Sequence, residues 1–381
     1  MKKIFFLTLL AMFLVSLSSC EKIKESDSEN IQSSLDVIAL LPLTGPAASL
    51  GEYLKNGLQL GQATVDKKFE DQIHINLRIV DTKSKPKNGI DALRSAMLIN
   101  KPDAVITALS SVSSAIKPIV DQEGIATIAT TTSLSGLPQN SSVIVRFYPT
   151  SDDFIPLVTK YIADKYKYPA VLYINDDFGH ANQQLFLNIM KTKSITVVTS
   201  QPYEFLPKDI HSLIAKVVSL SPDCIFLTGY GPSFIAVAKK IRETNPDVAL
   251  VAGIGFSNPT VLNSLGKVAE GVVFVGTDVD LSEPTLRESN EFAVKYRLLF
   301  GASTYHVAAY AHDAIVALAK AAMTEKSTTS ITKADMIKAS PYSGVVGTIY
   351  LDNFGEHKST LYLMENKEGK NVKIAQHVFQ N

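Results

Sequence analysis

The feature of this sequence that most limits its possible folds is a regular alternation of short aliphatic runs with longer segments of helical periodicity. Aliphatic runs bounded by turn residues are typical of strands buried on both faces. Strands that alternate with helices predict a parallel sheet with helices on both sides. In the first part of the chain we expect strands at residues 37–41, 73–79, 104–107, 125–129 and 143–147.

The same rhythm starts again after residue 150 and predicts a second sheet, with strands at residues 170–174, 195–200, 224–228, 248–252 and 272–275. A chain of 381 residues is too long for one compact core, since domains usually hold about 100–200 residues. Apolar residues make up 46% of the chain, which is enough to fill two cores. We therefore predict an α/β protein of two doubly wound, Rossmann-like lobes.

The pattern changes after Pro284. Helical segments are expected at residues 286–300, 307–323 and 333–339, with no strands between them. Residues 348–351 and 361–364 then predict a hairpin with a turn at 352–355. Because helices alone make a poor third domain here, we expect them to return and cover one of the two lobes.

The N-terminus has the pattern of an export signal. Lys2 and Lys3 precede an apolar stretch at residues 4–17, which is shorter than the ~20 residues of a membrane-spanning helix. The following Leu17-Ser18-Ser19-Cys20 resembles a bacterial lipobox, whose cysteine is lipidated and becomes the new N-terminus. The alternative is an ordinary signal peptide with a chance cysteine. We predict a signal peptide at residues 1–19, a lipid anchor on Cys20 and a polar, flexible tether at 20–34.

Composition and motifs exclude several classes of protein. Lys plus Arg and Asp plus Glu both total 37, so no basic surface for nucleic acid is expected. Cys20 and Cys224 are the two cysteines, too few for a disulfide framework or a four-cysteine zinc site, and Cys224 lies in a predicted buried strand. His306 and His312 would lie about 240° apart around a helix, so they do not form a zinc pair. With no phosphate-binding glycine motif either, we predict no metal, no cofactor and no enzymatic activity.

Hydroxyl side chains follow two of the predicted strands. Ser110 and Ser111 stand where a helix begins, and the free amides of a helix N-terminus favour an anion. Thr131 and Ser133 follow the next strand. Ligands of doubly wound sheets bind beyond the carboxyl ends of the strands, which predicts an anion-binding wall here. The alternatives are a serine that caps the helix and a loop whose hydroxyls satisfy each other.

Residues 38–48, followed by Gly51 and Asn56-Gly57, resemble the opening of the leucine/isoleucine/valine-binding proteins. These are type I periplasmic solute-binding proteins of ABC importers. Further similar stretches occur in the same order along the chain, at residues 110–115, 121–125, 173–179, 228–230 and 346–355. The resemblance covers residues 35 to about 364.

The resemblance implies two lobes joined by three hinge crossings, near Thr150, Asp278 and Gly344, with a ligand in the cleft between them. The first lobe would then comprise residues 35–149 plus 279–343, and the second residues 150–278 plus 344–381. The implied function is extracytoplasmic binding of an amino acid of the branched-chain type, or a related small carboxylate, by a monomer. Its partner would be an ABC permease, and its place the cell envelope, on the periplasmic side where there are two membranes.

The resemblance also assigns ligand contacts. The hydroxyl and amide of Ser110 would bind a carboxylate, the carbonyl of Thr131 an ammonium group, and the hydroxyl of Ser133 both. Phe178 and Tyr230 would cover the ligand from the second lobe after closure, although such aromatic residues also occur as ordinary packing at strand ends.

One stretch departs from the family. Its amino-acid binders place a glutamate for the ligand ammonium where this chain has Gly253-Ile254-Gly255. A buried ammonium without a counter-charge is costly. Either another acid such as Asp278 substitutes, or the ligand has no α-ammonium.

Asp176 and Asp177 are expected to form a turn and cap a helix rather than an acid/base pair. A sensory receptor and a cleft hydrolase are the alternative functions.

Overall fold

The computed structural model describes residues 33–69, 72–205, 209–324, 331–358 and 360–377. The predicted signal peptide, Cys20 and all but the last two residues of the predicted tether lie outside these ranges. No helix in the described ranges has the length and apolar character needed to cross a membrane.

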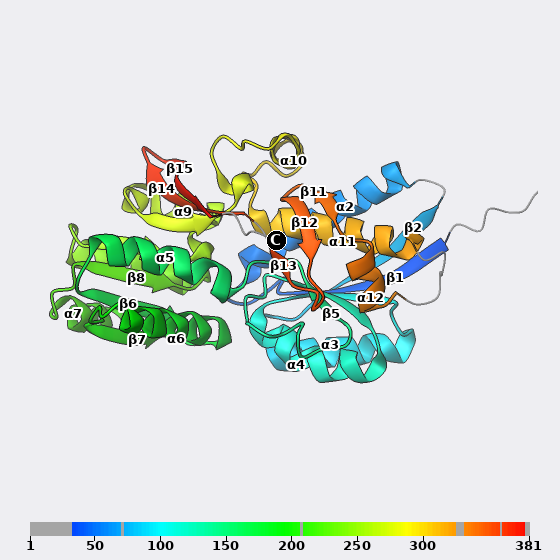
Figure 1. The fold of residues 1–381 in the computed structure, drawn as a ribbon, viewed down its shortest axis with the longest axis horizontal. Helices are drawn as coiled ribbons and strands as arrows, with labels where there is room; N and C mark the ends of the chain where they lie inside the picture. The colour runs from blue at the N-terminus through cyan, green and yellow to red at the C-terminus, as the bar shows by residue number, and fades with distance from the viewer. Residues whose placement is uncertain (1–32, 70–71, 206–208, 325–330, 359, 378–381) are drawn as a thin grey trace, which may run out of the picture. The chain divides into compact units, whose positions relative to one another are not determined.

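The first lobe is built on a parallel sheet with the strand order β2-β1-β3-β4-β5 (Figure 1). Alternate residues of β1 point to opposite faces, so Val37 and Ala39 belong to one core while Ile38 and Leu40 belong to another. Figure 1 shows α2 on one side of this sheet and α3 and α4 on the other. The elements are β1 (Ser33–Leu41), α2 (Ala48–Lys68), β2 (Ile73–Asp81), α3 (Pro86–Ile99), β3 (Ala104–Ala108), α4 (Ser110–Glu123), β4 (Ala126–Thr130) and β5 (Ile144–Arg146).

The second lobe is built on a sheet with the order β15-β14-β10-β9-β8-β6-β7, in which the strands from β10 to β7 are parallel and β14 and β15 antiparallel. Its strands are β6 (Pro169–Ile174), β7 (Thr199–Tyr203), β8 (Cys224–Thr228), β9 (Ala249–Ala252), β10 (Val273–Gly276), β14 (Leu361–Lys367) and β15 (Lys370–His377). Its helices are α5 (Ser151–Lys165), α6 (Asp177–Thr192), α7 (Ile210–Val218), α8 (Gly231–Thr244) and α9 (Pro259–Leu265), and short 3-10 turns η1 (Ile254–Ser257), η2 (Gly266–Ala269) and η3 (Asp278–Asp280) follow β9, α9 and β10. The predicted two-lobed α/β fold is thus confirmed.

The late helices are α10 (Arg287–Phe300), α11 (His306–Thr324) and α12 (Lys333–Lys338), and α11 packs along α2 of the first lobe. Two glycines of α2 permit this close approach. A Cβ on Gly57 would lie 2.1 Å from the carbonyl oxygen of Ala308, and one on Gly61 would lie 2.2 Å from Ile315 Cγ2. The late helices therefore return to the first lobe, where α11 and α12 contact strands of its sheet and Tyr296 of α10 stacks on Tyr53 of α2.

The predicted hairpin of residues 348–351 with 361–364 is wrong. β12 (Gly347–Leu351) pairs instead with β11 (Tyr342–Gly344) and β13 (His357–Lys358), and β14 pairs with β10 and β15. The turn at 352–355 does reverse the chain, but it places Glu356 in a buried ion pair with Arg146 of the first lobe. β13 therefore ends at Lys358, and the chain continues to β14 of the second sheet.

Two further expectations need correction. The chain crosses between the sheets for the third time between Lys358 and Leu361, not near Gly344, which lies in β11 against Asp313 of α11. The strand expected at residues 195–200 spans Thr199–Tyr203, because its first partner in β6 is Ala170 and the residues before Val198 extend past the end of that strand. The segments of Thr150 and Asp278 do lie where the chain passes between the sheets.

Candidate ligand-binding site

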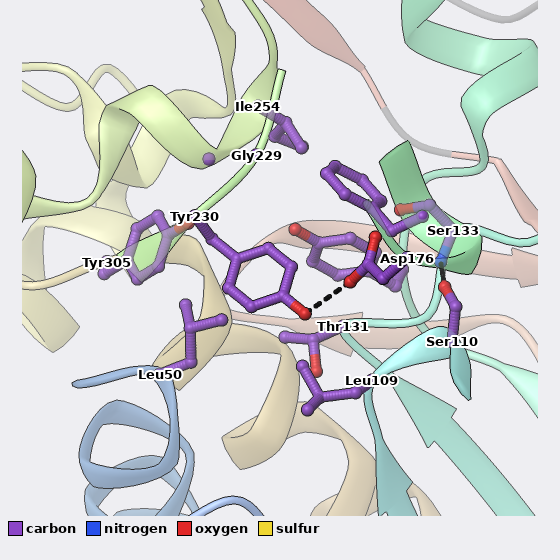
Figure 2. A pocket seen from close by; sticks show the side chains of 13 residues that line it. Leu50, Leu109, Ser110, Thr131, Ser133, Asp176, Gly229, Tyr230, Ile254 and Tyr305 are labelled. Atoms are coloured by element: carbon purple, nitrogen blue, oxygen red, sulfur yellow. Dashed lines mark hydrogen bonds between the residues drawn. The ribbon is translucent and has the colours of Figure 1, made fainter. Parts of the chain in front are cut away.

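A pocket lies where the carboxyl ends of the two sheets face each other, with about 440 Å³ of empty space that includes part of the open solvent (Figure 2). The first lobe lines it with Leu50, Leu109, Ser110, Thr131, Ser133, Tyr148 and Tyr305. The second lobe lines it with Asp176, Phe178, Gly229, Tyr230, Ile254 and Gly255. The pocket thus brings together Ser110, Thr131, Ser133, Phe178 and Tyr230 of the predicted site, whereas Ser111, one residue further along α4, does not line it.

The first-lobe wall is formed by two sharp turns at strand ends. Leu109 follows β3 with φ 71°, and Thr131 follows β4 with φ 46°. Residues other than glycine rarely adopt this left-handed region, at a cost of about 1 kcal/mol or more, and such strain concentrates at functional sites. The turns bring the next residues together, and the amide of Ser133 donates to Ser110 Oγ over 3.3 Å. Ser110 also begins α4, where free amides favour an anion.

Two hydroxyls of this wall have no partner in the part of the chain that the structure describes. They are Thr131 Oγ1 and Ser133 Oγ, both buried. A buried hydroxyl left without a hydrogen bond costs about 1–3 kcal/mol, which a ligand acceptor would recover. Ser114, on α4 but outside the pocket lining, also has a buried hydroxyl for which the described part of the chain offers no partner.

The neighbouring hydroxyls behave differently. Ser113 Oγ lies 3.2 Å from Thr107 Oγ1 and 2.9 Å from Thr132 Oγ1, and Thr132 Oγ1 also donates to the carbonyl of Thr130. The interpretation of a loop that satisfies itself therefore holds for Thr132, but it does not account for the two hydroxyls that line the pocket.

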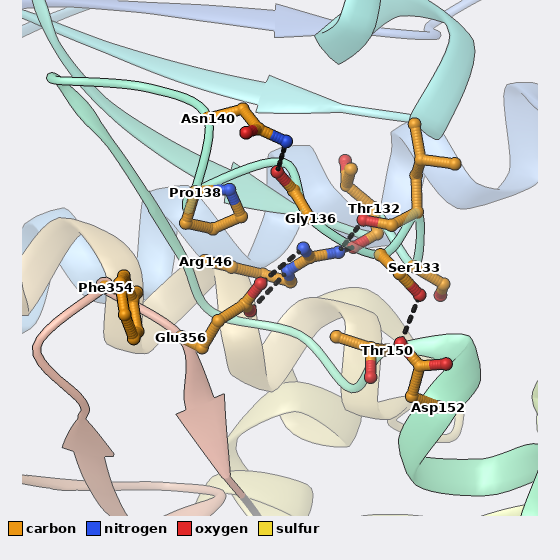
Figure 3. Close-up of polar contacts among 12 residues, drawn as sticks. Thr132, Ser133, Gly136, Pro138, Asn140, Arg146, Thr150, Asp152, Phe354 and Glu356 are labelled. Atoms are coloured by element: carbon orange, nitrogen blue, oxygen red, sulfur yellow. Dashed lines mark hydrogen bonds and ion pairs between the residues drawn. The ribbon is translucent and has the colours of Figure 1, made fainter.

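A buried ion pair fixes the loop that carries Ser133 (Figure 3). Arg146 of β5 donates to both carboxylate oxygens of Glu356, at 2.8 and 2.7 Å. Its remaining terminal nitrogen donates to the carbonyls of Thr132 and Leu134, at 2.8 and 2.6 Å. Because these carbonyls flank Ser133, the guanidinium holds the loop against β5 and sets the position of the Ser133 hydroxyl.

The second-lobe wall is formed where two helices begin. Asp176 caps α6, with Oδ1 accepting from the amide of Gly179 over 2.8 Å, which confirms the predicted cap. Its Oδ2 accepts from the hydroxyl of Tyr230 over 2.6 Å. Burial raises the pKa of Asp176, and the hydrogen bonds from Tyr230 and Gly179 oppose that shift. Burial also holds the pKa of Tyr230 well above its ordinary value.

Tyr230 is presented by a tight turn, as Gly229 and Gly231 at φ 157° and 75° indicate. Its ring lies 6.0 Å from that of Phe178 and 5.6 Å from that of Phe205, measured between centroids. Both Phe178 and Tyr230 therefore pack within the second lobe and also line the pocket, so the two interpretations of these aromatic residues are compatible.

The two lobes touch beside the pocket. A Cβ on Gly231 would lie 2.5 Å from the carbonyl oxygen of Pro46 in the loop after β1. Asn258 Nδ2 lies 3.5 Å from Ser49 Oγ at the same boundary. The structure therefore represents a closed arrangement of the lobes.

Sequence reasoning missed several residues of the pocket and misplaced one acid. Tyr148 follows β5, so it could have been predicted from the rule that ligands bind beyond the carboxyl ends of the strands. No local sequence pattern indicates Leu50 or Tyr305. Asp278 does not line the pocket, since its carboxylate accepts from the amides of Thr285 and Leu286. It therefore cannot be the counter-charge proposed for it.

His306 and His312 have hydrogen-bond partners nearby, and Cys224 is buried. His306 lies 2.6 Å from Asp280 and 3.1 Å from Tyr148, and His312 lies 2.8 Å from Asp313. Within the described ranges, no group of three or more His, Cys, Asp or Glu side chains could hold a metal ion. Cys224 is buried in β8, and burial raises the pKa of its thiol.

Two lobes of doubly wound sheet with a pocket between their carboxyl ends define the class of two-lobed solute-binding proteins. The chain belongs to the periplasmic binding protein family, whose profile matches residues 36–371, and within it to the leucine/isoleucine/valine-binding type.

Among known relatives, a Leu/Ile/Val-binding protein homologue of Brucella melitensis is 20% identical over 86% of this chain and 89% of its own length. The Leu/Ile/Val-binding protein of Escherichia coli is 24% identical over 64% of this chain and 67% of its own.

Two solved structures show the same fold. The branched-chain amino acid transporter substrate-binding protein LivJ of Streptococcus pneumoniae, in complex with isoleucine, superposes with a TM-score of 0.81 at 19% identity, covering 91% of this chain and 100% of that one. A solute-binding protein of an ABC transporter of Rhodopseudomonas palustris, in complex with 3,4-dihydroxybenzoic acid, does so with a TM-score of 0.81 at 19% identity, covering 91% and 98%.

Proposed function

We propose that this protein is the extracytoplasmic receptor of an ABC importer and binds an amino acid or a related small carboxylate between its lobes. The observation that carries the proposal is the pair of buried hydroxyls on Thr131 and Ser133, which line the pocket without a partner among the described residues. They are placed beside Ser110 at the start of α4, so a carboxylate would receive hydroxyl donors and helix amides at one point. Family membership and the named ligands of the two solved structures support it.

Binding would proceed in two steps. The ligand carboxylate first meets the wall of Ser110, Thr131 and Ser133, which is fixed by the Arg146–Glu356 pair. Closure then brings Phe178 and Tyr230 over the ligand and removes water from it. The closed form is selected because the ligand contacts both lobes only there, and the segments of Thr150 and Asp278 would absorb the rotation. The permease would recognise this closed form.

The receptor would be held at the membrane by a lipid. Removal of residues 1–19 would leave Cys20 as the acylated N-terminus, joined to the body by a short polar tether. Labelling cells with a radioactive fatty acid tests this directly, since the wild-type chain should carry label and a Cys20→Ala chain should not. Equal labelling of the two chains would contradict the anchor.

A thermal-shift screen tests the binding function. The purified protein would be heated with apolar amino acids, their 2-oxo acids, aromatic acids and the matching carboxamides, which lack the carboxylate. A ligand at 100 times its Kd should add ~2.7 kcal/mol to the stability of the folded state. We expect a carboxylate to raise the melting temperature, its amide to leave it unchanged, and the ligand to be recovered chemically intact. Absence of a shift with every carboxylate would overturn the proposal, and conversion of the ligand would favour a hydrolase.

A further inference from the structure

The pocket already carries a charge of the same sign as the anion that its hydroxyl wall favours. Asp176 is the single carboxylate among the described residues that line it, and no lysine, arginine or histidine is among them. Figure 2 shows its side chain between Tyr230 and the wall of Ser110, Thr131 and Ser133. A ligand bearing only a carboxylate would therefore be enclosed with a second negative group, and the described lining residues provide no cationic side chain to separate the two.

The structural roles of Asp176 do not use its full capacity. One oxygen caps α6 and the other accepts from Tyr230, whereas an ionised carboxylate offers about four acceptor sites. A carboxylate can cap a helix without being buried. Asp176 is partly buried, and this burial raises its pKa because the ionised form has lost part of its solvation by water. A cationic donor from the ligand would supply the missing partner.

The other part of the second-lobe wall has no room for an acid. A Cβ on Gly255 would lie 2.2 Å from the carbonyl oxygen of Gly229, so no side chain fits at this position. The neighbouring Ile254 is apolar, as are Leu50, Leu109 and Phe178 around the rest of the pocket. The lining thus offers one donor-rich end, one acidic group and an apolar remainder.

We propose that Asp176, held by the hydroxyl of Tyr230, binds an ammonium group of the ligand, and that the protein consequently selects amino acids with apolar side chains over simple carboxylates. This inference rests on the proposed function and specifies its ligand class. It assigns to the loop after β6 the counter-charge that is absent from the loop after β9.

Calorimetry with matched ligand pairs tests it. Leucine, isoleucine, valine and phenylalanine would each be compared with the 2-oxo acid of the same side chain, and 4-hydroxybenzoate would be added as an aromatic acid that lacks an ammonium group. For wild-type protein we expect at least one amino acid to bind at least tenfold more tightly than its 2-oxo acid. Asp176→Asn should weaken the amino acid at least 30-fold and the 2-oxo acid less than threefold, which removes the preference.

Asparagine caps a helix about as well as aspartate, so the variant should keep its melting temperature. Asp177→Asn is the matched control, because Asp177 is the adjacent acid and is exposed and outside the pocket lining. The affinity of this variant for the amino acid should change less than threefold. A wild-type protein that binds the 2-oxo acids or 4-hydroxybenzoate as tightly as every amino acid would overturn the inference while leaving the proposed function intact. Failure of all carboxylates to bind would overturn both.

Discussion

The two walls of the pocket are built on different physical principles. The first-lobe wall turns sharply at two strand ends, is held by a buried arginine, and contains two buried hydroxyls that have no partner among the described residues. The second-lobe wall begins two helices, and its groups are largely engaged with one another: Asp176 accepts from Gly179 and Tyr230 but keeps spare acceptor capacity, and the rings of Phe178 and Tyr230 pack together. The contrast teaches that the first wall is organised in advance to receive a ligand group, whereas the second supplies shape and charge once the lobes meet.

The largest expected effect comes from breaking the ion pair of Arg146 with Glu356, which fixes the first wall. Glu356→Gln leaves the Arg146 charge buried without its partner, and breaking such a pair typically lowers the free energy of unfolding by about 3–5 kcal/mol. The matched control is Glu291→Gln, in which an exposed pair with Arg287 is broken, with an expected loss of less than about 1 kcal/mol. Denaturant titration measures both. Equal losses would show that Arg146 does not fix the first wall.

The second wall is tested at its contact with the first lobe. Gly231→Ala would place a Cβ 2.5 Å from the carbonyl of Pro46, so the closed arrangement should be disfavoured. We expect the Kd of the ligand to rise about tenfold, which corresponds to ~1.4 kcal/mol. Gly301→Ala is the control, with a similar φ of 67° and no heavy atom of the described residues within 4 Å of the added Cβ. Both variants should lose similar stability from backbone strain. An unchanged Kd in Gly231→Ala would separate ligand binding from this lobe contact.

The smallest effects distinguish Ser133 of the first wall from the nearby Ser113, which does not line the pocket. Ser113 lies in a network with Thr107 and Thr132, so Ser113→Ala should lower the free energy of unfolding by about 1 kcal/mol and leave ligand affinity unchanged. Ser133→Ala removes a hydroxyl that has no partner among the described residues, so stability should stay the same or rise slightly while affinity falls. The reverse pattern in stability and affinity would exchange the roles assigned to these two residues.

The sequence predicted the fold well because strand and helix periodicities are local properties. It failed at the hairpin after β12, where the chain first returns to form the buried pair of Glu356 with Arg146, 210 residues apart in sequence, a contact that no local pattern marks. The misplaced strand at 195–200 has a similar cause, since its register is set by β6 rather than by its own residues.

The first wall of the site was also predictable, because hydroxyls after parallel strands must lie at one edge of the sheet. The second wall was harder to predict from sequence. Asp176 was correctly predicted to cap a helix, but only the fold shows that a cap and a pocket wall coincide in one carboxylate. Leu50 and Tyr305 enter the pocket through tertiary packing that leaves no local signal.

The role of the first wall is tested most directly by calorimetry with the strongest ligand on wild-type protein and on the Ser110→Ala/Ser133→Ala double variant. We expect the affinity to fall at least 100-fold while the melting temperature of the free protein changes little, because the carboxylate loses its donors on the first wall. An affinity within threefold of wild type would show that the ligand is bound elsewhere.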